Sequence, residues 1–446
     1  RQQTLRNAID WDYTLLDLEE QKLFRRLSVC RGGFSIEAAA AVVEAAGDLG
    51  LDLFDGLDSL SGKSLLRQVP SLQDEPRFGM LQTIREYALD VLDASEEGEA
   101  TRSAHARFYL AEAERAADEF RGPDQVRWLE MLELDHDNLQ DALEWAQLTD
   151  DWSLLLRLTA GMAQFWSIRG YHSEGRQWIG IALERTQGVT SLHRTRVLAG
   201  GAMLARARVD FVEGRRLLEE CVDAQRRLGD EAGVALSIKD LGNLEVDQGN
   251  IEAAEDLYRQ SLAEWRRLGD QQGIAQTLNN IGFITQIKGD QVEAMKMLDE
   301  SLGIFRQLRD KQGIARALMN IAVSTRELGD FKRAVRLSRE SLVLWRQLGD
   351  KWDVGDCLED LAGELHELSL TYQAAVIYGG AEALRWAIGA PRPPVEQEAY
   401  ERRVDAVHNV LGDALFSEAW ARGSAMRMEE VIDYALHDDP KEVEGV

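Results

Sequence analysis

Apolar residues in the middle of the chain follow the three-to-four-residue spacing of amphipathic helices, and this pattern repeats every 40 residues between Gly233 and Asp350. Two kinds of short polar break divide each repeat into two helices. The first kind is Leu-Gly-Asp or Leu-Arg-Asp and begins at Leu228, Leu268, Leu308 and Leu348. The second kind is Gly-Asn or Gly-Asp and begins at Gly249, Gly289 and Gly329. A period of about 20–50 residues with two breaks per unit predicts a solenoid of helical hairpins.

Small and aromatic residues recur with the same period. Small residues allow the helices to pack closely, and they recur at Gly242, Gly282 and Ala322 and again at Ala254, Ala294 and Ala334. Aromatic residues recur at Trp265, Phe305 and Trp345, and we expect them to form the core between successive repeats. Degenerate versions of the pattern extend the solenoid to residues 151–390. Because there is no proline between Pro123 and Pro391, nothing interrupts this series of helices.

Residues 1–96 combine helical and strand-like patterns in one compact unit. The helical spacing covers residues 5–16, 23–27, 35–46, 51–62 and 83–94, with Ser35 as the expected N-cap of the third helix. Two strand-like pieces, Ser64–Val69 and Arg77–Leu81, are joined by a turn that contains Pro70, Asp74 and Pro76. Helices followed by a hairpin and a closing helix predict a winged-helix domain.

The remaining segments are also helical. Residues 97–150 predict a helical connector, in which Asp135 caps the last helix within a solvent-exposed polar cluster. The prolines at 391, 393 and 394 end the solenoid, and residues 391–446 predict a helical cap that covers its last hydrophobic face. The predicted fold is therefore all-α: a right-handed helical-hairpin solenoid, with regular units at 233–350, preceded by a small winged-helix domain with a short β-hairpin.

Charge argues against nucleic-acid binding. Among 446 residues, 78 are acidic and 51 are basic, so the net charge is −27, whereas binding to phosphates needs clustered Lys and Arg. The helix before the hairpin carries Asp52, Asp55 and Asp58 and no basic residue before Lys63. We therefore expect this chain to make no direct contact with nucleic acid.

Composition also bears on the compartment. The longest apolar runs are well below the roughly 18 residues of a membrane span, so we expect no membrane contact. Three widely spaced cysteines, Cys30, Cys221 and Cys357, fit reduced thiols in a cytoplasmic protein. The chain begins with Arg1 rather than Met, directly before an amphipathic pattern, which predicts that it is part of a longer protein.

No arrangement of residues predicts catalysis. The seven histidines are scattered, no serine has a nucleophile-elbow context, and no phosphate-binding GxxxxGK[ST] sequence occurs. His136 next to Asp137 has no second histidine at a metal-ligand spacing. We therefore expect that the chain is not an enzyme and that it binds neither a metal nor a cofactor of its own.

The concave side of the solenoid is the expected binding surface, because stacked first helices line a groove there. Positions predicted to face the groove include Lys239, Asp240, Asn243, Gln276, Asn279, Asn280, Arg316, Asn320, Arg326, Asp356, Glu359 and Asp360. Lys and Arg supply charge-assisted donors, whereas Asn and Gln bind a peptide backbone. Lys239, Asn243, Gln276, Asn279, Asn280, Arg316 and Asn320 are the candidate ligand-binding residues. An alternative is that Asn280 and Asn320 only brace neighbouring helices.

Two resemblances extend these predictions. The repeats resemble tetratricopeptide repeats, and Lys239, Asn243, Asn280, Arg316 and Asn320 resemble the carboxylate clamp of chaperone-binding tetratricopeptide proteins, which has a basic residue where this chain has Asn320. The winged helix resembles the domain that follows the nucleotide-binding core of STAND-type signalling NTPases, above all bacterial transcription regulators. The matching segments are LFRRLSVCRGGFSIEAA, SLLRQV, RFGMLQTIREYALDVL, HDNL, GAEALRWAIGAPRPPVEQEAYERRV and ALFSEAWARGSAMRMEEVIDYAL.

This resemblance implies a function. Met80, Leu81 and Gln82 occupy the place of a Met-His-Asp motif that senses bound ADP in related NTPases, although Leu81 and Gln82 replace the His and Asp; alternatively, Met80 and Leu81 pack the domain core. The implied role is the sensor arm of a signalling NTPase, with ATP or ADP bound only in a core upstream of Arg1, a protein or peptide ligand in the groove, and a homo-oligomer on activation. The alternative is a free-standing scaffold without nucleotide control.

Overall fold

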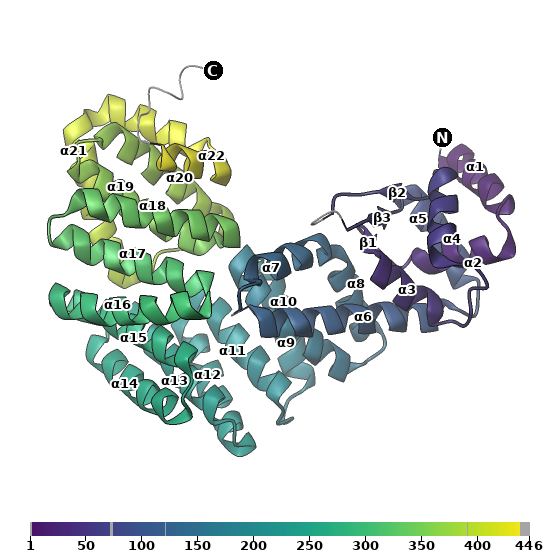
Figure 1. The fold of residues 1–446 in the computed structure, drawn as a ribbon, viewed down its shortest axis with the longest axis horizontal. Helices are drawn as coiled ribbons and strands as arrows, with labels where there is room; N and C mark the ends of the chain where they lie inside the picture. The colour runs from purple at the N-terminus through teal and green to yellow at the C-terminus, as the bar shows by residue number, and fades with distance from the viewer. Residues whose placement is uncertain (1, 72–74, 121, 390, 438–446) are drawn as a thin grey trace. The chain divides into compact units, whose positions relative to one another are not determined.

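The computed structural model describes residues 2–71, 75–120, 122–389 and 391–437, which form two compact units (Figure 1). The first unit contains residues 1–120 and 127–162, and the second contains residues 121–126 and 163–446. Asp74, predicted to lie in the turn of the hairpin, is outside the described residues. None of the helices in the described part of the chain is both long enough and apolar enough to cross a bilayer.

The first unit begins with a small domain of helices around a short sheet. Its elements are α1 (Gln2–Thr14), α2 (Leu18–Leu27), β1 (Phe34–Ser35), α3 (Ile36–Glu44), α4 (Leu53–Gly62), β2 (Arg67–Gln68), β3 (Arg77–Gly79) and α5 (Gln82–Asp93). The strands pair antiparallel in the order β1-β3-β2, so that Phe78 of β3 lies opposite both Phe34 and Gln68. This order of helices and strands confirms the predicted winged-helix region; the sequence pattern missed β1, which has only two residues.

Capping side chains begin α2, α3 and α4. Asp17 and Glu20 form a reciprocal capping box at the start of α2. Ser35 Oγ accepts a hydrogen bond from the backbone N–H of Ala38 at 3.1 Å, as predicted for an N-cap. The helices bury Leu23, Phe24 and other apolar side chains that form the core.

The helices α6 (Gly98–Glu119), α7 (Gln125–Leu134), α8 (His136–Leu148) and α9 (Trp152–Arg169) follow the winged helix. Asp135 precedes α8, but its side chain makes no capping hydrogen bond. Instead, Asp135 is buried and accepts a hydrogen bond of 2.6 Å from Arg77 of β3. Asn138 is also buried, and it donates to the carbonyl oxygen of Gly33 at 2.7 Å. The prediction of an exposed capping cluster was wrong, because Arg77 supplies a partner that the local sequence does not reveal.

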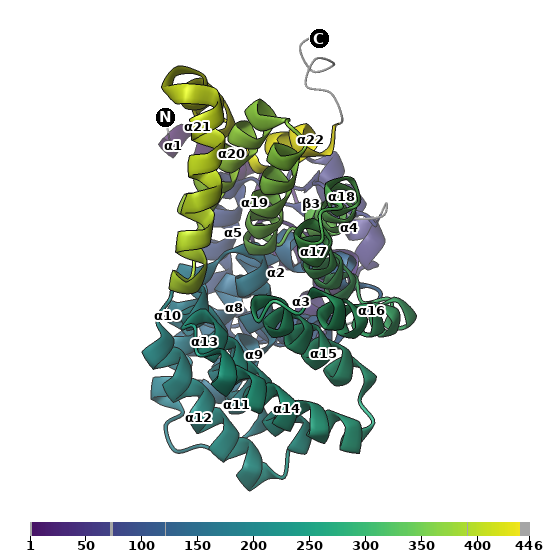
Figure 2. The ribbon, with the colours of Figure 1, turned by 90° about the vertical axis from the view of Figure 1, so that its left-hand side faces the viewer.

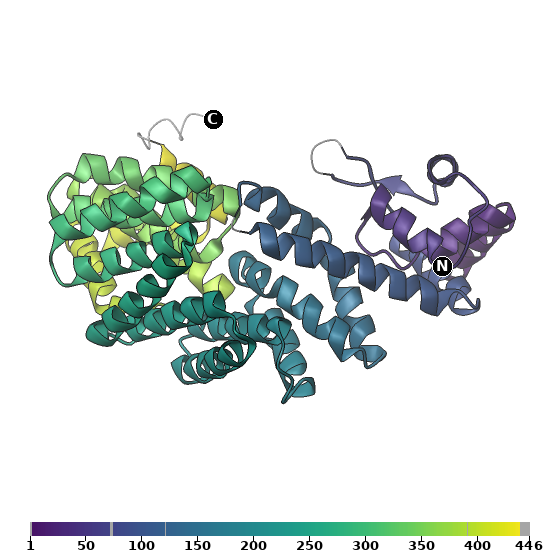
Figure 3. The same cartoon turned by 60° about the horizontal axis from the view of Figure 1, so that its bottom comes forward.

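The second unit is a solenoid of helical hairpins, which confirms the predicted fold class. Figure 3 shows the paired helices of the repeats stacked side by side, from teal to green. The helices are α10 (His172–Arg185), α11 (Leu192–Ala207), α12 (Phe211–Leu228), α13 (Glu231–Asp247), α14 (Ile251–Leu268), α15 (Gln271–Ile287), α16 (Gln291–Leu308), α17 (Lys311–Glu327), α18 (Phe331–Leu348), α19 (Lys351–Glu367) and α20 (Thr371–Ile388).

The recurring Leu-Gly-Asp sequence ends one helix and begins the next. Gly269, for example, is the C-cap of α14 in the left-handed conformation, with φ of 73°, which glycine adopts without steric cost. The following Asp270 accepts a hydrogen bond of 2.8 Å from the backbone N–H of Gly273 in α15. Arg309 adopts the same left-handed conformation, with φ of 57°, in the one break that lacks glycine.

The recurring aromatic residues are buried between repeats, as predicted. Trp265, Phe305 and Trp345 are at most 3% exposed. Gly273 lies so close to the ring of Trp265 that a Cβ atom at this position would be 2.2 Å from it, and the same distance separates a Cβ atom at Gly313 from the ring of Phe305. Glycine at these positions therefore allows the aromatic ring of one repeat to pack on the next.

The C-terminal helices do more than cover the end of the solenoid. α21 (Pro394–Ser424) has a non-helical backbone at Gly412, which divides it into two limbs, and α22 (Met428–Leu436) follows. The second limb packs tightly on α20, since a Cβ atom at Gly423 would overlap the carbonyl oxygen of Val376. Figure 2 shows α21 running past α19 and α20 toward α13. The first limb, residues 394–411, thus lies along the concave side of the repeats, an arrangement that the sequence did not predict.

Candidate ligand-binding cavity

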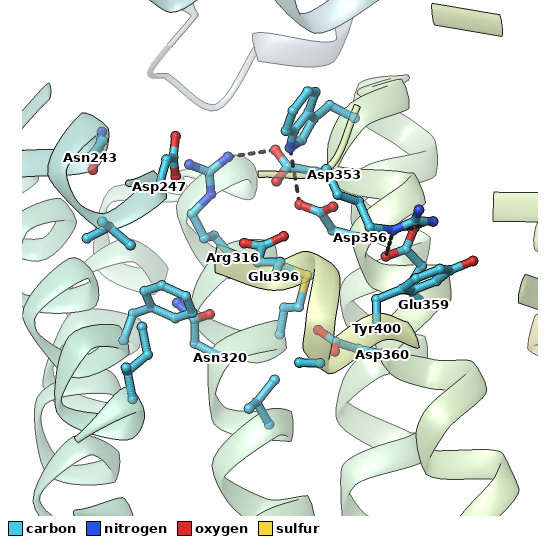
Figure 4. A pocket seen from close by; sticks show the side chains of 18 of the residues that line it. Asn243, Asp247, Arg316, Asn320, Asp353, Asp356, Glu359, Asp360, Glu396 and Tyr400 are labelled. Atoms are coloured by element: carbon cyan, nitrogen blue, oxygen red, sulfur yellow. Dashed lines mark hydrogen bonds and ion pairs between the residues drawn. The ribbon is translucent and has the colours of Figure 1, made fainter. Parts of the chain in front are cut away.

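A cavity of about 800 Å³ lies on the concave side of the second unit (Figure 4). Its wall is formed by the first helices of successive hairpins (α11, α13, α15, α17 and α19), by parts of α9, α10 and α14, and by the first limb of α21. Ligand-binding cavities commonly measure about 300–1,000 Å³. The cavity is therefore large enough to receive a small molecule or a short peptide segment.

One side of the cavity carries asparagine side chains. Asn243, Asn279, Asn280 and Asn320 line it from α13, α15 and α17. Asn280 Nδ2 donates to Asn243 Oδ1 at 2.9 Å, and Asn320 Nδ2 donates to Asn279 Oδ1 at 3.2 Å. These bonds join adjacent repeats, so the bracing role considered from the sequence is present. The same side chains also border the cavity.

The candidate residues do not all reach the cavity. Asn243, Asn279, Asn280, Arg316 and Asn320 line it, whereas Lys239 and Gln276 do not. Lys239 Nζ lies 3.2 Å from Asp240 Oδ1 and donates to Gln276 Oε1 at 3.3 Å. The structure therefore separates the two basic residues of the clamp-like set.

Charged residues dominate the opposite side. The carboxylates that line the cavity are Asp247, Glu327, Asp350, Asp353, Asp356, Glu359, Asp360, Glu367 and Glu396. The lining arginines are Arg206, Arg316, Arg326, Arg392, Arg402 and Arg403, and no lysine is found among the lining residues of the described chain. Carboxylates thus outnumber cationic side chains by nine to six.

Each of the lining arginines is already paired with a carboxylate. Arg316 Nη2 lies 2.6 Å from Asp353 Oδ2, and the Arg316 guanidinium also lies 5.5 Å from the centre of the Trp345 ring. The other pairs are Arg206–Asp247 (2.5 Å), Arg326–Asp360 (3.5 Å), Arg392–Glu359 (2.6 Å), Arg402–Glu398 (3.3 Å) and Arg403–Asp360 (2.8 Å). Two of these pairs, Arg392–Glu359 and Arg403–Asp360, hold the first limb of α21 and the turn before it against α19.

Glu396 differs from these carboxylates. It projects from the first limb of α21 into the cavity (Figure 4), and its carboxylate has no hydrogen bond or ion pair with any described residue. Burial, together with the nearby carboxylate of Asp356, raises the pKa of Glu396. Burial also raises the pKa of Asp356, although Arg385 opposes the shift. Both carboxyl groups therefore hold a proton at higher pH than an exposed carboxyl does.

The sequence already indicated some of the carboxylates on this side of the cavity. With the 40-residue period, Asp356 is equivalent to Gln276 and Arg316, and Asp360 is equivalent to Asn280 and Asn320, so carboxylates replace amide and guanidinium groups in the last repeat. These residues were predicted to face the groove, and they do. Glu396 was missed because only the path of α21 brings it there.

The proposed nucleotide-sensor position lies in the first unit. Leu81 is 48% exposed and precedes α5, so the prediction that it packs the domain core was wrong; Met80 is partly buried. Gln82 is exposed, and its Nε2 donates to Glu86 Oε1 at 3.1 Å. A role in sensing nucleotide stays a prediction.

Comparison with known proteins identifies both parts of the chain. Residues 16–93 match the winged helix-turn-helix domain family, and residues 231–307 and 273–347 match the tetratricopeptide repeat family. "Putative HTH-type transcriptional regulator Mb0914c" of Mycobacterium bovis is 32% identical over 281 residues, which are 59% of this chain and 31% of that protein. The chain thus spans less than a third of the length of this curated relative.

A solved structure of a Rap protein has a similar fold. The Rap protein complexed with Competence and Sporulation Factor has a TM-score of 0.52 and 15% identity, over 86% of this chain and 99% of that one. A STAND protein with a tetratricopeptide repeat sensor from Pyrococcus horikoshii has a TM-score of 0.46 and 15% identity, over 94% of this chain and 65% of that one. The chain therefore contains one region similar to winged helix-turn-helix domains and another similar to tetratricopeptide repeats, and it is similar in sequence to mycobacterial proteins described as putative HTH-type transcriptional regulators.

Proposed function

We propose that this chain is the sensor arm of a cytoplasmic signalling protein and that it binds a peptide, or a peptide segment of a partner protein, in the cavity of its repeats. The observation that carries the proposal is the cavity itself, because the first helices of five hairpins and the first limb of α21 all contribute to its wall. Its asparagine amides are suited to hydrogen-bonding a peptide backbone. The Rap protein, whose fold is similar, is complexed with Competence and Sporulation Factor.

Binding in the cavity offers a route to regulation. Arg403 of α21 pairs with Asp360 of α19, so the position of α21 depends on the same residues that a ligand would contact. A ligand that interacts differently with two arrangements of α21 would shift the balance between them. No catalytic step is assigned to the chain; its role is to bind and to transmit.

The order of the modules supports a place in a larger regulator. A winged helix followed by tetratricopeptide repeats occurs here, and the relative of similar sequence is a longer HTH-type regulator. We infer that a STAND-type nucleotide-binding core, holding ATP or ADP, precedes Arg1 and that activation produces a homo-oligomer. The full-length open reading frame tests this inference: a phosphate-binding sequence upstream is expected, and its absence would favour a free-standing scaffold instead.

DNA contact is not assigned to the first unit. The helix before the hairpin, α4, begins at Leu53 after the N-cap Asp52, and Lys63 at its end forms an ion pair with Glu20. Asp55 and Asp58 of the same helix are exposed and would repel phosphates. In an electrophoretic mobility assay at physiological salt, we expect the chain to shift random duplex DNA no more than an acidic control protein does.

Selection of peptides from a phage library tests the proposed function directly. The full chain is immobilised and selected against a phage library of random heptapeptides, and enriched peptides are synthesised and titrated. Val323, which lines the cavity from α17, is replaced by Trp to fill it, and Val343 of α18, which is 40% exposed and does not line the cavity, receives the same replacement as a control. Binding lost in Val323→Trp and kept in Val343→Trp is expected. No enrichment, or equal binding to both variants, would contradict the proposal.

A further inference from the structure

The last repeat and the first limb of α21 concentrate carboxylates at one end of the cavity. Asp353, Asp356 and Asp360 are three and four residues apart on α19, and this spacing places them on one face of the helix. Glu396 comes from α21 and completes the acidic end in space (Figure 4). We call these four residues the acidic end.

Neighbouring arginines form ion pairs or hydrogen bonds with three of these carboxylates, whereas Arg385 and Arg206 act on Glu396 only at longer range. Asp353 pairs with Arg316, and Asp360 pairs with Arg403 and Arg326. Asp356 accepts hydrogen bonds from Arg385 and from Trp352 Nε1. Glu396 has no such partner among the described residues, and it lies near Asp247 and Asp356. The four arginines in these contacts match the four carboxylates in number, so what sets this end apart is the Glu396 carboxyl, an acceptor with no hydrogen-bond donor among the described residues.

The same contacts disfavour an anionic ligand. A carboxylate that entered the cavity would need a guanidinium, but Arg316 is already bound to Asp353 at 2.6 Å, and Lys239 lies outside the lining. Breaking a partly buried ion pair leaves an uncompensated charge behind. The clamp for a carboxylate that the sequence resembled is therefore already occupied by this chain's own carboxylates.

We propose that the acidic end receives a positively charged group of the ligand, namely a lysine or arginine side chain or a free amino terminus, while the asparagines at the other side hold the peptide backbone. This inference rests on the proposed function and adds the chemical class of the ligand. A cation placed beside Glu396 favours the ionised carboxylate and gains a charge-assisted hydrogen bond to it.

The heptapeptides selected on the full chain provide the test. We expect Lys and Arg to be enriched over Asp and Glu among peptides whose binding Val323→Trp abolishes. Replacing the enriched basic residue by norleucine is expected to weaken binding about tenfold, the loss of one charge-assisted hydrogen bond. Glu396→Gln is expected to weaken the basic peptide by a similar factor and to leave the norleucine peptide unchanged.

Asp405→Asn is the matched control, because Asp405 lies on the same limb of α21, is exposed and does not line the cavity. It is expected to change neither affinity. Circular dichroism melting confirms that both variants fold. Peptides that depend on the cavity but are acidic or uncharged, and that bind Glu396→Gln as tightly as the unsubstituted chain, would overturn the cationic-ligand inference while leaving the proposed function standing. Failure to select any cavity-dependent peptide would instead overturn the proposed function.

Discussion

The regular repeats and the last repeat have the same 40-residue period, but they differ in the kind of side chain at an equivalent buried position. Each regular unit has an aromatic residue at the same position of the repeat. These residues are Trp265, Phe305 and Trp345, and all three are buried between repeats. The equivalent position in the last repeat is Arg385, which is 4% exposed and pairs with Glu359 at 2.6 Å. An aromatic contact between repeats has thus become an ion-pair network. This comparison shows that one backbone arrangement can be maintained by two different kinds of interaction.

The difference follows from what each repeat contacts. A regular repeat packs on another repeat, so its interface can be apolar throughout. The last repeat packs on α21 and on the turn before it, which carries Arg392, and its concave face meets the cavity. Solvent reaches the cavity, so polar groups can remain there without the full cost of burial. Ion pairs that would be costly to bury between regular repeats are therefore found at the end of the solenoid.

The largest expected losses of stability come from truncating Trp345 and Arg385, which occupy equivalent positions in successive repeats. Trp345→Ala removes a fully buried indole and should destabilise the chain by about 3–5 kcal/mol. Arg385→Ala leaves Asp356 without its arginine, and a loss of about 3 kcal/mol is expected for breaking a buried pair. Urea denaturation measures both.

The pH dependence distinguishes the two. At pH 5 the loss in Arg385→Ala should shrink, because the carboxylates left behind become protonated, whereas the loss in Trp345→Ala should not change. Equal losses for Arg385→Ala at pH 5 and pH 7.5 would contradict an electrostatic role for Arg385.

Glycine substitutions provide a sharper comparison. Gly313→Ala places a Cβ atom 2.2 Å from the ring of Phe305 and should cost about 1–3 kcal/mol. In the last repeat, a Cβ atom at Gly355 would meet only the Arg385 side chain, at 3.7 Å. Gly355→Ala should therefore stabilise the chain by up to about 1 kcal/mol, since alanine favours the helix. Shifts of the denaturation midpoint in the same direction for both variants would refute this contrast.

A smaller effect is expected within the regular units. Arg309 adopts a left-handed conformation that glycine has in three equivalent breaks. Arg309→Gly should stabilise the chain by about 0.5–1 kcal/mol, because relief of the backbone strain exceeds the added entropy of the unfolded chain. Gly269→Ala, measured in the same way, should have the opposite sign. A lower melting temperature for Arg309→Gly would show that the arginine side chain matters more than the backbone.

The last comparison concerns pH at the acidic end. Burial, and after it Asp356, raises the pKa of Glu396 to about 8. A carboxyl whose pKa is higher in the folded state favours folding fully below its unfolded pKa, and this contribution is lost as the pH rises through the folded-state value. Glu396→Gln should therefore flatten the decline in stability between about pH 4.5 and pH 8. Thermal melts across this range test it, and an unchanged pH profile would mean that Glu396 titrates as an exposed carboxyl does.

Much of the regular solenoid could be predicted because its determinants are local or periodic. The left-handed Gly269, the capping Asp270 and the buried Trp265 each act within a few residues or at a constant distance of 40 positions. Such interactions leave a repeated mark in the sequence. For the same reason, the asparagines of the cavity wall could be placed before the structure was known.

Other features of the structure leave no repeated pattern in the sequence. Arg77 and Asp135 are 58 residues apart, and the buried pair they form replaced the exposed cap expected at Asp135. Lys239 has the spacing of a clamp residue, but its ammonium group turns to Asp240, outside the cavity. Side-chain direction depends on neighbours in space, which a single helical period does not specify.

The sequence by itself determined the helical hairpins, their period, the caps between them and the winged helix before them, because these depend on backbone conformation and on the spacing of apolar residues. Only the tertiary structure decided what the concave side can bind. It does so because the break at Gly412 lets the two limbs of α21 take different paths, and the first limb brings Glu396 to the carboxylates of α19. The charge of the cavity is a sum over residues far apart in the chain, and electrostatic interactions depend on distance in space rather than on separation in sequence.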